Sequence, residues 1–167
     1  MNIKLYLLEN SLKKFLSIFV LVLSIGVLMG LTYLSQTTKY SPNKAIERFN
    51  GSQENTSEDM LDIPETYPKP ISEMLITTHN HIIGFSLIFF MIGIIFYFNS
   101  VIVANWKLFL MIEPLISTIV TFGSIWGMRY LTKEFVYLAA LSSTLIYLSY
   151  FTMVIIILYE LIFKKEK

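Results

Sequence analysis

The sequence contains no cysteine and little charge. Without cysteine, disulfides, thiolate metal sites, iron–sulfur clusters and cysteine nucleophiles are all excluded. Charged residues make up 15% of the 167 residues and hydrophobic residues 54%, whereas soluble domains carry about 25% charged residues. The net charge of +1, from 13 basic and 12 acidic side chains, lacks the basic excess of a nucleic-acid binder. This composition indicates a membrane protein and no nucleic-acid partner.

Long stretches with few or no charges predict four membrane-spanning helices. At about 1.5 Å per residue, some 20 apolar-dominated residues cross a hydrocarbon core of roughly 30 Å. An uncharged stretch too long for one span is divided by the turn signal Asn99-Ser100. Trp106 and Trp126 bracket the third span like interfacial anchors. We therefore expect an all-α, antiparallel four-helix membrane bundle, a single domain over 1–167, with spans at about 15–35, 76–98, 107–128 and 134–163.

A secretory signal peptide is the alternative interpretation of the first hydrophobic stretch, because Lys13 and Lys14 precede it. Signal peptides have hydrophobic regions of only about 7–15 residues that end in small residues at a cleavage site. This stretch is longer and lacks those small residues, so we expect a retained anchor.

The basic residues near the span ends predict the orientation. With the N-terminus inside, seven lysines lie close to the membrane on the inner face, whereas six basic residues on the outer face are spread over a longer stretch of chain. This density favours both termini in the cytoplasm of a bacterial inner membrane. The inner residues are Lys4, Lys13, Lys14, Lys107, Lys164, Lys165 and Lys167, and the outer ones are Lys39, Lys44, Arg48, Lys69, Arg129 and Lys133.

Residues 36–73 then form a polar extracytoplasmic loop between the first two spans. Ser41-Pro42 is a helix-start signal and Asn50-Gly51 a stop signal, so we expect a short surface helix between them. Residues 51–70 are polar, acidic and proline-bearing, which predicts an extended connector without a core of its own. Pro70 can open the helix of the second span.

His79 and His81, in the run Thr77-Thr78-His79-Asn80-His81, are the chain's two histidines. Residues two apart on a helix diverge by about 200°, which weakens a shared metal site. His81 is the better candidate to face the bundle, because Gly84 leaves room beside it. We expect His81 to meet Arg129 and Tyr130 in a polar cluster at the outer interface.

A haem with histidine and methionine axial ligands is an alternative use of these residues. Met29 and Met128 lie at about the right depth, and Arg129 with Tyr130 could receive the propionates. The competing interpretation is an interfacial histidine that hydrogen-bonds to a neighbouring helix, with methionines that fill packing gaps. Haem b or a metal ion therefore stays an alternative, with no assured cofactor.

Glu113, directly before Pro114, is the only acidic residue well inside an apolar span. An intramembrane carboxylate suggests a proton or ion path, yet one this near the inner end can also reach the interface. Two glycine pairs with small-xxx-small spacing, Gly26 with Gly30 and Gly123 with Gly127, predict close helix contacts within the chain or with a partner.

The loop residues 47–51 (Glu-Arg-Phe-Asn-Gly), the run Thr78-His79-Asn80-His81 and the pair Arg129-Tyr130 at a helix end form one pattern. This pattern resembles a set of small bacterial inner-membrane proteins without assigned activity, which carry Thr-His-x-His at the outer end of the second of four helices. Their Tyr-Arg-Gly-Asn-like loop stretch is altered here to Arg-Phe-Asn-Gly. The resemblance implies a four-helix protein whose shared polar residues gather on the outer side, and it transfers no reaction.

Two functions from different classes follow. The leading hypothesis is a non-enzymatic subunit or accessory protein of a bacterial envelope complex, with a protein partner or a second copy bound through membrane helices. It rests on the lack of any catalytic spacing, on the glycine pairs and on the outer loop. The rival is a small haem- or metal-binding redox protein that uses His79 or His81.

Overall fold

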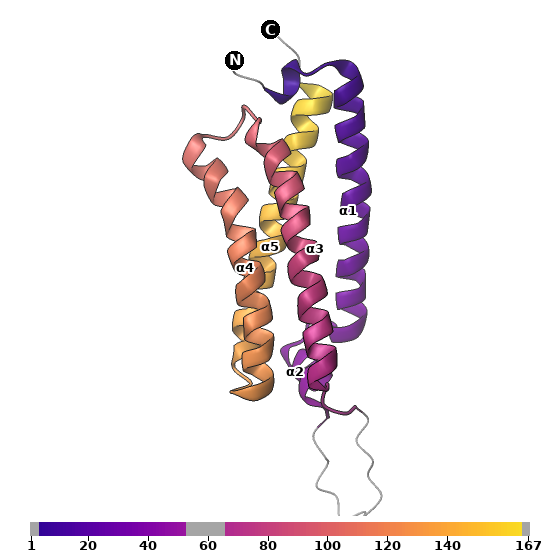
Figure 1. Cartoon of the computed structure of the whole chain (residues 1–167), viewed down its shortest axis with the longest axis vertical. Coiled ribbons are helices and arrows are strands. Elements are labelled where there is room, and N and C mark those ends of the chain that lie inside the picture. Colours follow the sequence, from indigo (N-terminus) through magenta and orange to yellow (C-terminus); the bar gives the residue numbers. More distant parts are fainter. Residues whose placement is uncertain (1–3, 53–65, 165–167) are drawn as a thin grey trace, which may run out of the picture.

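The computed structural model describes residues 4–52 and 66–164, which contain helices and turns and no strand. Four long helices run side by side, and η1 and η2 lie at one end of the bundle while α2 lies at the other (Figure 1). In chain order the elements are η1 (Leu5–Leu7), α1 (Asn10–Thr38), α2 (Pro42–Asn50), α3 (Ile71–Tyr97), α4 (Ala104–Tyr130), α5 (Phe135–Leu158) and the π-helical η2 (Tyr159–Phe163).

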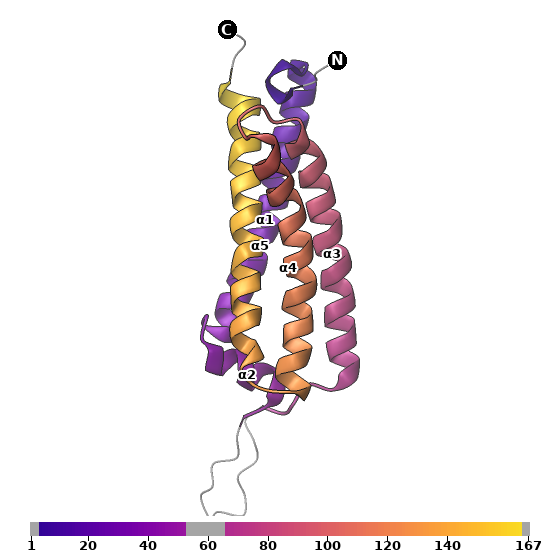
Figure 2. The same cartoon turned by 90° about the vertical axis from the view of Figure 1, so that its left-hand side faces the viewer.

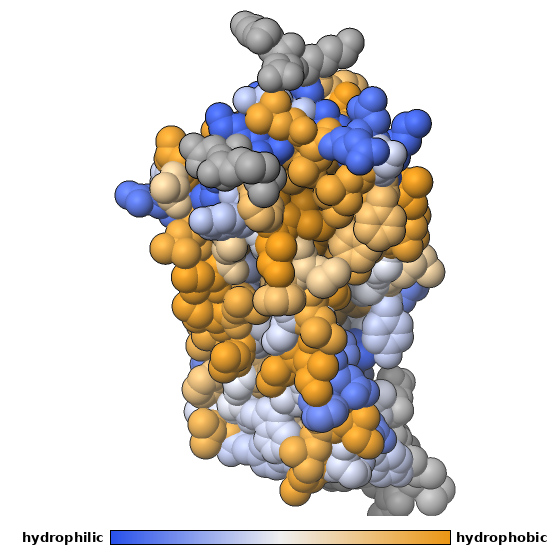
Figure 3. Space-filling view, turned by 45° about the horizontal axis from the view of Figure 1, so that its top comes forward, coloured by the Kyte–Doolittle hydropathy of each residue, from blue (hydrophilic) through white to orange (hydrophobic). Residues whose placement is uncertain are grey.

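Four helical stretches are long and apolar enough to cross a membrane: α1, α3, α4, and α5 together with η2. Helices of 27 to 29 residues are about 40 Å long, more than a hydrocarbon core of roughly 30 Å. Hydrophobic side chains cover much of the flank, and hydrophilic ones gather toward the η1 end (Figure 3). The predicted all-α architecture of four packed membrane helices is confirmed.

The helices extend beyond several of the predicted span bounds. α1 begins at Asn10, five residues before the predicted start. The prediction stopped at Lys13 and Lys14, but lysine is a good helix former whose long stem carries its charge to a polar surface. The Nζ atom of Lys13 donates a hydrogen bond to the carbonyl oxygen of Tyr6, 2.6 Å away. A charge therefore marks the membrane boundary without ending the helix.

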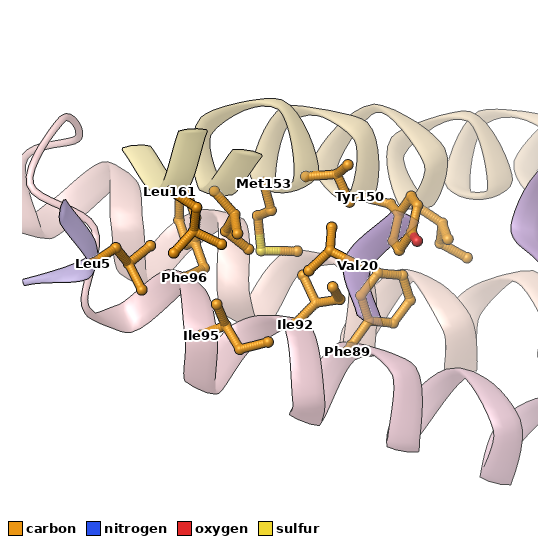
Figure 4. Packing of buried hydrophobic residues seen from close by; sticks show 12 residues of the cluster. Leu5, Val20, Phe89, Ile92, Ile95, Phe96, Tyr150, Met153 and Leu161 are labelled. Carbon is orange, nitrogen blue, oxygen red and sulfur yellow. The ribbon is translucent and has the colours of Figure 1, made fainter. Parts of the chain in front are cut away.

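The main apolar core lies between α1, α3 and α5 (Figure 4). Val20 of α1, Ile92 and Phe96 of α3, and Met153 of α5 are 0% exposed. Tyr150 of α5 is also buried, and its hydroxyl lies 3.2 Å from the hydroxyl of Ser24 in α1. Lipid is as apolar as these side chains, so their burial gains nothing from the hydrophobic effect. Van der Waals packing between the side chains therefore supplies the attraction between the helices.

The helix α1 is peripheral. In its most apolar 18-residue stretch 17% of the residues are buried, against 44% in the stretch that comprises α5 and η2. Figure 2 shows α1 behind α5, on the side of the bundle away from α4. Most of the surface of α1 is therefore left to lipid or to another protein.

The turn predicted at Asn99-Ser100 is confirmed between α3 and α4. The side chain of Asn99 is buried, and its Nδ2 atom donates to the carbonyl oxygen of Phe96 at 2.6 Å. Its Oδ1 atom accepts from the backbone N–H groups of Val101 and Ile102 at 3.1 and 2.9 Å. One asparagine thereby satisfies three backbone groups of the turn.

The predicted surface helix is confirmed as α2, with Ser41 at its N-cap and Pro42 at its first position. The helix ends at Asn50, and the next residue, Gly51, has a φ of 85°, which lies in the region that favours glycine. A Cβ atom at Gly51 would lie 2.8 Å from the Cδ atom of Pro68. Of the acidic connector predicted over 51–70, residues 53–65 lie outside the described residues.

Candidate functional site

Most of the polar residues singled out by the sequence lie at the end of the bundle that carries α2, here called the α2 end. His79 is exposed on α3. The Nδ1 atom of His81 lies 2.7 Å from the carbonyl oxygen of Thr77, one turn earlier in the same helix. The ring of His81 packs against Phe122 of α4, with 5.2 Å between ring centroids. His81 thus contacts α4 through an aromatic ring.

Arg129 and Tyr130 lie at the end of α4. The guanidinium of Arg129 lies 5.3 Å from the ring centroid of Tyr130, which in turn stacks on Trp126 at 5.5 Å. The Nε1 atom of Trp126 donates to the hydroxyl of Thr78 in α3 at 2.9 Å. Within residues 4–52 and 66–164, no hydrogen bond, ion pair or ring contact joins His81 to Arg129. The polar link between α3 and α4 here is the Trp126–Thr78 bond, which sequence reasoning missed.

The short helix α2 ties α1 to α4 at this end. Arg48 donates hydrogen bonds to the hydroxyls of Thr37 and Tyr33 in α1, the latter at 3.1 Å. Asn50 donates from Nδ2 to the carbonyl oxygen of Met128 in α4 at 3.1 Å. The Oδ1 atom of Asn50 and the Nε atom of Arg129 are buried, and neither has a hydrogen-bond partner among residues 4–52 and 66–164.

The two methionines considered as haem ligands lie in different environments. Met29 is 66% exposed on α1, and Met128 is buried in α4. In the described part of the chain, no group of three or more His, Asp and Glu side chains could hold a metal ion.

The four glycines of the small-xxx-small pairs also differ. A Cβ atom at Gly26, Gly30 or Gly123 would meet nothing within 4 Å. A Cβ atom at Gly127 would lie 2.8 Å from the ring of Phe135, at the start of α5. Of the four, Gly127 is the one in a close contact within the chain.

Glu113 is held between α4 and α5 by two hydroxyl groups. Ser117, one turn further along α4, donates to its Oε1 atom at 2.5 Å. Ser149 of α5 donates to its Oε2 atom, also at 2.5 Å. The carboxylate is half-buried, and it borders a hollow of about 480 Å³ between the two helices.

Buried hydroxyls continue from Glu113 along the contact between α4 and α5, and we call this row the hydroxyl seam. The hydroxyls of Thr121 and Ser142 lie 2.7 Å apart across the two helices. A spacing of four residues places Glu113, Ser117 and Thr121 on one face of α4, and this pattern was a usable signal. The seam comprises Ser117 and Thr121 of α4 with Ser142 and Ser149 of α5, all of them buried.

A second carboxylate within a candidate membrane span, that of Glu160, lies at the η1 end of the bundle and is 0% exposed. It accepts hydrogen bonds from the backbone N–H of Ser100 at 2.9 and 3.1 Å, and from the hydroxyl of the same residue. Lys164 forms an ion pair with it at 3.2 Å. The sequence placed Glu160 inside the fourth span but gave no sign that the turn at Ser100 would reach it.

The hydrogen bonds of the described residues define what these arrangements can do chemically. Among the hydrogen bonds of the described residues, no serine or threonine hydroxyl is joined to a histidine that could act as its base. Glu113, with two hydroxyl donors and no neighbouring ammonium group in the described part of the chain, can hold a proton or a cation.

Four apolar helices with buried polar contacts between them define a multi-pass helical membrane protein. Residues 39–167 match the model of the Aq_1264_TM family, described as a transmembrane helical domain, and the chain belongs to that family. No curated protein and no solved structure matches the chain significantly. The family gives the class of protein and no activity.

Proposed function

We propose that this integral membrane protein is a non-enzymatic subunit or accessory protein of a bacterial envelope complex, and that α1 is its contact helix. The observation that carries the proposal is the outward face of α1. Gly26 and Gly30 lie one turn apart there and are exposed, and apart from the backbone of α1 itself no atom of residues 4–52 and 66–164 lies within 4 Å of a Cβ position at either.

Glycine is the least favourable helix former apart from proline, by about 1 kcal/mol relative to alanine. A glycine that packs against nothing therefore has no local benefit in a helix exposed to lipid. A second helix that approaches this face would gain from both glycines, because backbones can then come close together. Few residues of α1 are buried against the other helices of its own bundle, so this face is accessible to a second helix.

The proposal is tested by Gly26→Leu combined with Gly30→Leu in the full-length chain. We expect the wild-type protein, extracted from its own membranes with a mild detergent, to migrate in a complex larger than one copy. The double variant migrates as a single copy. Ala140→Leu is the control, since it enlarges an exposed small residue on another helix, α5, and leaves the complex intact.

Förster transfer between two differently labelled copies in proteoliposomes then separates a homo-oligomer from a complex with another protein. A wild-type chain that is a single copy in both experiments would contradict the proposal. So would a complex that survives both leucine substitutions.

The proposal places both termini in the cytoplasm and the α2 end on the outer side of the inner membrane. The support is the lysine density at the η1 end, where Lys13, Lys107 and Lys164 all donate hydrogen bonds to carbonyl or hydroxyl oxygens. A reporter fused after residue 167 is expected to behave as cytoplasmic, and an extracytoplasmic signal would reverse the orientation.

At the outer side, we propose that His81, Arg129 and Tyr130 serve as one polar surface toward a partner. The support is their exposure at the α2 end, where His81 and Tyr130 are exposed and Arg129 is partly exposed, together with the cost of a guanidinium left unpaired near hydrocarbon. An absorption spectrum of the purified protein separates this role from a haem protein. A Soret band that disappears in His81→Ala would contradict it.

A further inference from the structure

We infer that the hollow beside Glu113 is a binding site for a monovalent organic cation with apolar substituents, which enters from the lipid phase. The hollow, called here the Glu113 groove, lies between α4 and α5 and has a volume of about 480 Å³. Pockets for small organic ligands span about 300–1,000 Å³. Its lining combines Glu113 and Ser117 with Phe109, Ile112, Ile116 and Leu145.

The charge in the groove is unmatched. Within residues 4–52 and 66–164, no lysine, arginine or histidine forms an ion pair with Glu113, whereas Glu160 is paired with Lys164 at 3.2 Å. The two serine hydroxyls at 2.5 Å donate hydrogen bonds to the Glu113 side chain but supply no positive charge. An unpaired charge near hydrocarbon is costly, so a cation that enters the groove gains a partner that the protein does not supply.

The apolar lining selects what kind of cation fits. Phe109 and Ile116 are 51% and 57% exposed on the flank of α4, so the groove opens sideways toward lipid. Aromatic rings such as that of Phe109 attract cations over their faces. Alkyl or aryl substituents on the cation would cover apolar surface that the protein leaves uncovered.

Inorganic cations fit the groove poorly. Calcium takes six to eight oxygen ligands and magnesium keeps several waters, while the groove offers one carboxylate and few other polar atoms. Besides Glu113, the polar side chains that line the groove are Asn105 and Ser117, too few oxygen ligands for such an ion. An organic ammonium or phosphonium ion needs no such coordination shell.

The test measures binding of radiolabelled tetraphenylphosphonium to the full-length protein in detergent by equilibrium dialysis. We expect saturable binding at one site per chain. Glu113→Gln keeps the size of the side chain but removes its charge, with one acceptor oxygen replaced by an NH2 donor. It should weaken binding roughly 30-fold or more, as expected when one partner of a desolvated charge pair is lost.

Glu73→Gln is the matched control, because Glu73 is an exposed carboxylate at the start of α3, and it should bind like the wild type. Leu145→Trp fills the groove without altering charge and should also abolish binding. The uncharged triphenylphosphine oxide should not compete. Equal binding by wild type and Glu113→Gln, or no saturable binding by the wild type, would overturn the inference.

A second arm identifies the source of the cation. The protein is placed in nanodiscs that contain either phosphatidylethanolamine or phosphatidylglycerol. Displacement of tetraphenylphosphonium by phosphatidylethanolamine, but not by phosphatidylglycerol, assigns the groove to a lipid amine. Displacement by neither lipid assigns it to a free lipophilic cation. This site is independent of the proposed contact at Gly26 and Gly30, which lies on the other side of the bundle, so either proposal can fail without the other.

Discussion

The helix α5 packs against its neighbours in two different ways. Toward α1 and α3 it presents large apolar side chains such as Met153 and Ile157, both 0% exposed. Toward α4 it presents Ser142 and Ser149, which hydrogen-bond to Thr121 and Glu113. One helix therefore borders a dry apolar core on one side and the hydroxyl seam on the other.

The two contacts of α5 have different roles: the apolar core stabilises the bundle, and the hydroxyl seam offers polar groups that can take part in chemistry. Apolar packing inside a membrane depends on shape, because lipid is an equally apolar environment, and buried hydroxyl pairs contribute only modestly. The apolar core therefore carries most of the packing energy. The hydroxyl seam has a polar lining that a ligand or proton can use. Four predictions test this division, from the largest expected effect to the smallest.

Phe96→Ala should destabilise the protein most. Phe96 is fully buried between α3 and α5, and truncating a buried phenylalanine costs about 3–5 kcal/mol through lost contacts and the cavity left behind. Unfolding in mixed micelles with dodecyl sulfate measures the change. Phe90→Ala, at a position on α3 that is 60% exposed, is the control and should cost far less. Equal losses would show that the apolar core is not where the packing energy lies.

The two membrane-side carboxylates should respond differently to removal of their charge. Glu160→Gln weakens charged hydrogen bonds to Ser100 and Lys164, at a cost of about 1.5–3 kcal/mol. Glu113→Gln loses no ion pair among the described residues and keeps one oxygen that can accept from a serine hydroxyl, so it should cost less than Glu160→Gln. The same unfolding measurement compares them, and the reverse order would break the distinction between a structural and a binding carboxylate.

The pair Thr121 and Ser142 should show a small coupling energy. Interhelical hydrogen bonds in membranes average about 0.6 kcal/mol in double-mutant cycles. Thr121→Val, Ser142→Ala and the double variant complete the cycle, again by unfolding in mixed micelles. A coupling energy as large as the cost of Phe96→Ala would assign the seam a main structural role.

Much of the fold was predictable because its signals are local. The spans follow from uncharged length, the turn from Asn99-Ser100, and α2 from Ser41-Pro42 and Asn50-Gly51. The expectation that His81 meets Arg129 stays a prediction about the outer surface. It rested on shared depth alone, and depth does not determine which faces of two helices meet.

The polar contacts that hold the bundle were missed because they join residues far apart in the chain. The bond from Ser149 to Glu113 and that from Ser100 to Glu160 depend on how each helix is rotated. A row of hydroxyls at helical spacing after Glu113 was readable in the sequence, yet its partner surface on α5 was not. Such pairings require the packed structure.

The absence of cysteine from the sequence permits the most direct test of the central claim, that α4 and α5 pack against each other along the hydroxyl seam. Thr121→Cys combined with Ser142→Cys places two thiols where hydroxyls lie 2.7 Å apart. Mild oxidation in native membranes should form an intrachain disulfide, seen as a mobility shift that reductant reverses. The control pair, Thr121→Cys with Leu141→Cys, uses a position that is 60% exposed and should form none. A disulfide in the control pair but not in the seam pair would contradict the packing of these two helices.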